Sequence, residues 1–141
     1  MKRYFIIVLI TQVVLNFSCK KPDNTITTES EENIVALISN LGNDVNTQTV
    51  VCTNQSQEIK ISLSSKMPSK GILINCELKP TLETSDATIK ESYNFTSGVS
   101  YTIPLNNKIR KGEIYLSSIT LKSNSNTTNL LTISDFKVVW Q

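Results

Sequence analysis

The chain contains no histidine, and this absence is the most informative feature of its composition because it excludes several classes of functional site. Without histidine, a Ser-His-Asp or Cys-His nucleophilic site and a histidine-ligated zinc site cannot be built. Glycine is also scarce, with four residues in 141, and none stands in a spacing that would cradle phosphate groups. No segment matches a calcium-binding EF-hand loop. We therefore expect no cofactor and no metal.

The acidic residues do not predict an enzyme either. A glycosidase needs only two carboxylates at a set separation, and Glu77, Glu83, Asp86 and Glu91 exist, but acids in such numbers usually are surface charges around a loop. We predict no catalytic residues. The segment after residue 18 holds twelve basic and twelve acidic residues and no basic patch with interleaved aromatics, so nucleic-acid binding is not expected.

The first 18 residues have the three parts of a secretory signal peptide. Lys2 and Arg3 are the positive start, and an apolar stretch runs from residue 5 to 15. That stretch is too short to span a hydrocarbon layer, which needs about 20 helical residues. The small residue Ser18 then precedes Cys19. We predict cleavage after residue 18.

The segment Leu15-Asn16-Phe17-Ser18-Cys19 resembles the lipobox of bacterial lipoproteins, in which a small residue stands before an obligatory cysteine. The resemblance covers the leader alone, and Asn16 and Phe17 depart from the commonest residues of the motif. It implies that Cys19 carries lipid and anchors the chain to a membrane of the bacterial cell envelope, facing the periplasm or the cell surface. The alternative is plain cleavage at the same bond. Residues 19–33 are polar and predict a flexible tether.

Two further cysteines remain once Cys19 is assigned to lipid. An even number in an oxidising compartment favours a disulfide between Cys52 and Cys76. The alternative is a pair of buried free thiols.

Period-two alternation dominates residues 34–141, which we predict to be one β-sandwich domain. The alternating segments are 59–63, 72–78, 89–95 and 99–105, followed by a long hairpin formed by 113–122 and 129–140. In each hairpin strand the apolar phase switches once, at Ser117-Ser118 and at Ser134-Asp135, which predicts a bulge or a strand that passes between sheets. Residues 34–41 fit a short amphipathic helix as well as a first strand, and the sequence leaves both open.

Seven or eight short strands in about 110 residues predict an all-β, antiparallel, two-sheet sandwich. Residues 48–140 look like the immunoglobulin-like or fibronectin-III-like domains of bacterial envelope proteins. Function does not follow from such a likeness. We expect a non-catalytic binding or accessory module with an unknown protein or glycan partner, and Trp140 is the aromatic residue selected as a candidate contact. The alternatives are a structural adhesin or assembly component, and a periplasmic inhibitor or immunity-type lipoprotein.

Overall fold

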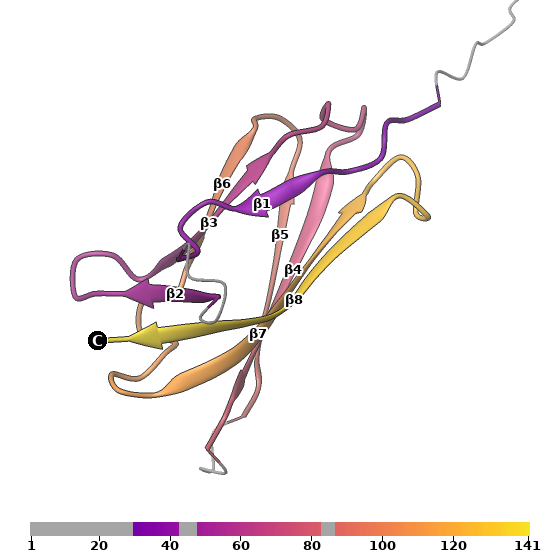
Figure 1. Cartoon of the computed structure of the whole chain (residues 1–141). Coiled ribbons are helices and arrows are strands. Elements are labelled where there is room, and N and C mark those ends of the chain that lie inside the picture. The colour runs from indigo at the N-terminus through magenta and orange to yellow at the C-terminus, as the bar shows by residue number, and fades with distance from the viewer. Residues whose placement is uncertain (1–29, 43–47, 83–86) are drawn as a thin grey trace, which may run out of the picture.

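Eight strands and no helix make up the described part of the chain, which is residues 30–42, 48–82 and 87–141 of a computed structural model (Figure 1). The strands are β1 (Ala36–Ile38), β2 (Thr49–Cys52), β3 (Glu58–Leu63), β4 (Ile72–Pro80), β5 (Ile89–Phe95), β6 (Ser100–Pro104), β7 (Ile114–Ser123) and β8 (Leu130–Trp140). The predicted all-β class is confirmed.

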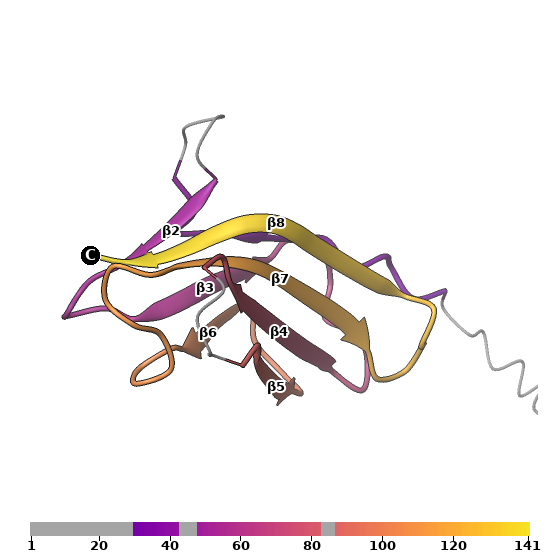
Figure 2. The same ribbon diagram turned by 90° about the horizontal axis from the view of Figure 1, so that it is seen from below.

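The strands form two sheets, which Figure 2 shows as two layers. One sheet has the order β1-β3-β6 and the other has the order β2-β8-β7-β4-β5. The prediction of purely antiparallel pairing is wrong in one place, because β2 runs parallel to β8. A parallel pair needs a long connection rather than a hairpin turn, and here β3 to β7 lie between the two partners in the chain.

The core lies between the sheets and is built from alternate residues of each strand. In β4, for example, Ile72, Ile74 and Leu78 are fully buried, while Glu77 and Lys79 on the opposite face are exposed. Burying an aliphatic side chain of this size contributes about 1.5–3 kcal/mol. The largest fully buried side chains are Tyr115, Phe136, Ile59, Ile61, Ile72, Ile74, Leu78, Ile103, Leu105, Ile119, Leu121 and Val50.

The predicted change of phase in β8 is confirmed as a β-bulge. The register shifts between Ser117 and Ile119 of β7, where β8 carries one extra residue. Asp135 takes a positive φ of 63° at this point. The extra residue lets Ile133 and Phe136 both contribute to the core although they are an odd number of positions apart.

The predicted change of phase in β7 is wrong. Alternate residues from Tyr115 to Ser123 stay buried along the whole strand. Ile114 and Leu116 therefore lie on the outer face, 40% and 43% exposed. The sequence suggests a switch because Ile114 and Leu116 are in the opposite phase to the apolar residues Ile119 and Leu121, and all four are expected in the core.

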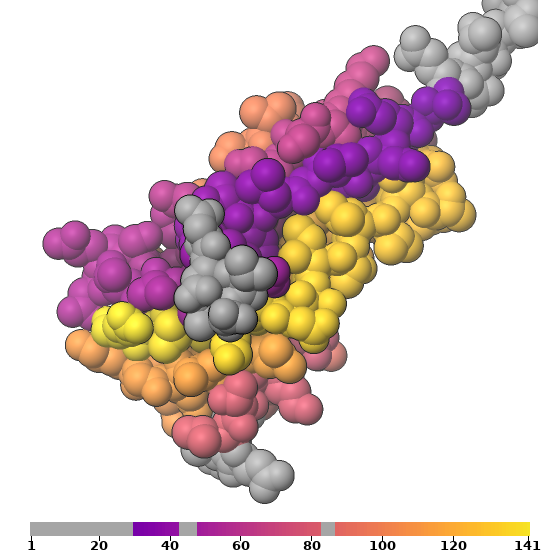
Figure 3. All heavy atoms as spheres, viewed as in Figure 1, coloured from indigo at the N-terminus to yellow at the C-terminus, as the bar shows by residue number. Residues whose placement is uncertain are grey.

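Residues 34–41 contain a strand, which decides between the two predicted alternatives. Ala36 to Ile38 pair with β3 in antiparallel register. Just before this strand, Glu31 accepts hydrogen bonds from Ser125 and Asn129 in the β7–β8 turn. Those bonds hold the segment in an extended path along the hairpin, as Figure 3 shows for the indigo chain beside yellow β8.

Candidate functional site

The predicted lipid attachment site, Cys19, lies outside the described residues, together with the predicted signal peptide and residues 19–29 of the tether. Within the described ranges, no helix has the length and apolar character needed to cross a membrane.

The predicted disulfide is absent, since Cys52 and Cys76 are both free thiols. Cys52 lies in β2 and Cys76 in β4, and strands β8 and β7 stand between them in the sheet. Three strand spacings amount to about 14 Å, twice the Cα separation of about 7 Å beyond which a disulfide cannot form. The structure thus has the alternative, two buried thiols. Counting cysteines could not reveal this, because parity says nothing about strand order.

Neither thiol is placed to react. Burial, with a smaller contribution from nearby Glu91, raises the pKa of Cys76 to about 12. Burial also raises the pKa of Cys52. Both groups stay protonated at neutral pH, and the thiolate is the reactive form. We therefore assign both cysteines a structural role as packed residues of the core.

The contacts that the structure shows for Trp140 lie within the domain. Its indole is half-buried against the core, and its Nε1 donates a hydrogen bond to Asn54 Oδ1 at 3.1 Å. This bond ties the end of β8 to the turn between β2 and β3. The prediction that Trp140 contacts a partner is not tested by these contacts.

Glu77 and Glu91, the two candidate acids that the structure describes, do not form a carboxylate pair. Glu77 lies on the outer face of β4 and interacts with Lys90 at 3.6 Å. Glu91 points inward from β5 and pairs with Lys108 at 2.8 Å. The two carboxylates therefore lie on opposite faces of one sheet, while residues 83 and 86 fall outside the described ranges. Within those ranges, no group of three potential metal ligands is found either.

A hollow of about 250 Å³ lies beside the first residue of β5, lined in part by Ile89, Asn107 and Lys108. The ammonium of Lys108 is already bonded there, to Glu91 and to the hydroxyl of Tyr93. Burial alone would lower the pKa of Lys108, but these bonds raise it. The cation in the hollow thus has its counter-ion within the fold.

The outer face of the five-stranded sheet carries an apolar cluster at one end. Strand register places Val51 of β2, Val139 of β8 and Ile114 of β7 in one row across the sheet. Leu116 lies in the next row. Val51, Ile114 and Leu116 are 48%, 40% and 43% exposed, so their burial is left incomplete by the fold. We call these four residues the apolar end patch.

Two lysines flank this patch in the row of Leu116. Leu116 pairs with Lys137 of β8 on one side and with Lys79 of β4 on the other. Both lysines are exposed, and neither forms an ion pair within the described part of the chain. The nearest acid on β8 is Asp135, whose carboxylate accepts a bond from Ser134. The border of the patch is thus positively charged.

The aromatic rings lie away from this outer face. In the ranges that the structure covers, every aromatic residue occupies an inward-facing position and packs in or against the core: Tyr93, Phe95, Tyr101, Tyr115, Phe136 and Trp140. Sugar-binding surfaces commonly rely on exposed rings, which this face does not offer.

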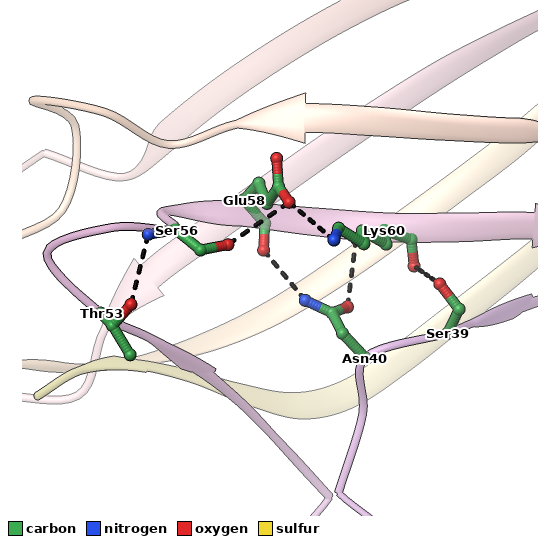
Figure 4. A network of polar contacts seen from close by, with 6 residues as sticks. All are labelled: Ser39, Asn40, Thr53, Ser56, Glu58 and Lys60. Carbon is green, nitrogen blue, oxygen red and sulfur yellow. Dashed lines mark hydrogen bonds and ion pairs between the residues drawn. The ribbon is translucent and has the colours of Figure 1, made fainter.

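Several edges of the two sheets are closed to further strands. β1 has three residues, and beyond it the side chain of Asn40 continues the pairing with β3 (Figure 4). Asn40 Nδ2 donates to the carbonyl of Glu58 at 3.1 Å, and its Oδ1 accepts from the amide of Lys60 at 3.1 Å. β6 ends in Pro104, which has no amide hydrogen to donate. Short edges and proline are devices by which sheets avoid pairing with other chains.

The longest edge strand, β5, carries an inward-pointing charge that opposes the addition of another strand. Glu91 points inward from its centre, and its carboxylate is neutralised by Lys108 from the loop after β6. An added strand would have to accommodate this pair at the sheet edge, and inward-pointing charges are known to oppose such additions.

The chain joins the domain at the opposite end from the patch. Asn129, which is buried, accepts a bond from the amide of Ile34 at 2.9 Å and donates to Glu31 Oε1 at 2.6 Å and to the carbonyl of Glu32 at 2.8 Å. We call this set of bonds the tether latch. Figure 1 shows the N-terminal segment at the β7–β8 turn and the C-terminus at the far end of β8. No protein-family model, curated protein or solved structure matches the chain.

Proposed function

We propose that the domain is immunoglobulin-like. If β3 to β8 are taken as strands B, C, C′, E, F and G, the two sheets have the orders A-B-E and G-F-C-C′, which are those of this fold class. The additional strand is β2, which lies parallel to β8.

Tyr115 supports the same proposal. Such domains often carry a tyrosine near the start of strand F whose hydroxyl bonds to backbone a few residues upstream. Tyr115 is the second residue of β7, and its buried Oη accepts a bond from the amide of Arg110 at 3.0 Å. The same hydroxyl donates to Glu113 Oε2 at 2.7 Å.

We further propose that the protein is a lipid-anchored, non-catalytic module that binds another protein at the bacterial cell envelope. The apolar end patch is the observation that carries this proposal. β8 separates the patch from the tether latch by nine residues, or about 30 Å, so the patch lies far from the point at which an anchored chain joins the domain. A surface at that end is accessible to a partner while the other end faces the anchor.

The other candidate functions have less support. For a glycan partner, the outer face offers no exposed aromatic rings within the described residues. For an assembly component that adds strands, the edges at β1, β6 and β5 are closed or charged. An inhibitor would need a rigid protruding loop, and the loop between β4 and β5 lies in part outside the described residues.

The proposal is tested in envelopes of bacteria that produce the full chain, with Cys19→Ala as the matched unlipidated control. We expect the wild-type chain to sediment with membranes and to incorporate labelled fatty acid, and the control to do neither. Wild-type chain that stays soluble would refute the anchor. Affinity purification of the wild-type chain that enriches no protein over a mock purification would refute the binding role.

A further inference from the structure

We infer that the partner is a protein with an acidic surface around an apolar centre, which packs face-on against the apolar end patch. The inference rests on the proposed binding function and adds the place and the chemistry of the contact. An interface needs an apolar centre from which water is excluded and a polar rim that fixes register and partner choice. The outer face has both, in adjacent rows.

The charge of the two flanking lysines indicates which kind of partner fits this surface. Lys79 and Lys137 lie on either side of Leu116 and form no ion pair within residues 30–42, 48–82 and 87–141, so carboxylates of a partner can pair with them. A second copy packed about a two-fold axis through Leu116 is disfavoured, because that axis would bring the same lysines together. Like charges brought into contact oppose association by several kcal/mol.

Side-chain type and position argue against a membrane as the occupant. Trp and Tyr are enriched at membrane interfaces, and this patch has no aromatic side chain: it is built of Val, Ile and Leu on a sheet. It also lies at the end of β8 remote from the tether latch. A sheet face of small aliphatic side chains suits the packed centre of a protein interface.

The apolar centre is small, with three exposed side chains and half-buried Val139. Small interfaces are typical of transient complexes. We therefore expect a dissociation constant on the order of micromolar that rises with ionic strength, because rim charges are screened by salt.

Site-specific photocrosslinking in the full, anchored chain tests the inference. A benzophenone amino acid is placed at Leu116, and at Thr120 in a control chain, on the same strand and the same face one row beyond the bulge. We expect the probe at 116 to give a cross-link to a protein peptide that contains Asp or Glu, and the probe at 120 to give none. Equal products from both positions, a cross-link to lipid, or a cross-link to a second copy would each overturn the inference.

Charge reversal supplies the second arm. In the 116 probe chain, Lys79→Glu with Lys137→Glu should reduce the cross-link on the order of tenfold, and Lys79→Arg with Lys137→Arg should retain it. Thermal unfolding followed by the fluorescence of Trp140 shows that each variant is folded before the comparison. A cross-link that survives reversal in folded chain refutes the acidic partner yet leaves the binding role standing.

Anionic phosphatidylglycerol vesicles are the remaining probe, and binding of the Cys19→Ala chain to them through Leu116 would identify a membrane surface instead.

Discussion

The absence of a disulfide between Cys52 and Cys76 has a large and measurable consequence for stability. A bond that closes a loop of about 25 residues contributes about 3 kcal/mol by restricting the unfolded chain. For a domain of this size, 1 kcal/mol shifts the unfolding midpoint by roughly 3–6 °C. A protein with the bond would lose about 9–18 °C on reduction. Because the structure places β7 and β8 between the two cysteines, we expect no shift.

The experiment uses the Cys19→Ala chain, so that Cys52 and Cys76 are the remaining thiols. Thermal unfolding is followed by the fluorescence of Trp140, the single tryptophan, with and without reductant after purification under air. A thiol reagent should then modify no cysteine in the native protein and both in denaturant, because burial raises the pKa of both thiols, that of Cys76 to about 12, and shields them.

Cys76→Ala is the matched control, and it should lower the midpoint by the same amount with and without reductant. A midpoint that falls by about 10 °C on reduction, or fewer than two thiols in the denatured, unreduced chain, would refute the strand order on which the reasoning depends.

Three further predictions concern the backbone and the buried hydroxyl. Gly71 and Gly112 both have positive φ, but a Cβ would contact the backbone of β5 at Gly71 and meet open space at Gly112. Gly112→Ala should therefore cost about 1–2 kcal/mol in urea unfolding and Gly71→Ala at least twice as much; equal costs would contradict the close approach. Asp135→Val should destabilise by about 1–2 kcal/mol relative to Asp135→Gly, since a β-branched residue is strained at φ 63°, and indistinguishable midpoints would argue against the bulge. Tyr115→Phe should cost about 1–3 kcal/mol, because the amide of Arg110 loses a buried acceptor; an unchanged unfolding free energy would show that this bond contributes little.

Period-two alternation was sufficient to predict most of the large strands, because their inner faces are packed and their outer faces are wet. The segments 59–63, 72–78, 89–95 and 99–105 coincide closely with β3 to β6. The bulge in β8 was also predictable, since Ile133 and Phe136 both need burial and stand out of phase. These features depend on residues that are neighbours in the chain.

The rest depended on contacts between distant parts of the chain. The short run Thr49–Cys52 gives no sign of its parallel partner, which lies more than eighty residues away. Asn129 has no sequence pattern that predicts a bond to Ile34, 95 positions earlier. Ile114 and Leu116 suggest a change of phase in their strand, and they are instead two of the three exposed residues of the apolar end patch.

The tether latch determines how the domain would respond to mechanical force. In the proposed anchored state the chain would pull at Ile34, beside the β7–β8 turn, and the proposed partner would hold the other end of the same two strands. The part of the load that passes through the tether latch would enter β8 at its first residues and would load the cross-strand hydrogen bonds of β7 and β8 in shear. Bonds in shear must break together, whereas a hairpin pulled open from one end loses them one at a time. If the proposed anchor and partner are both engaged, the domain would carry tension between them along these two strands.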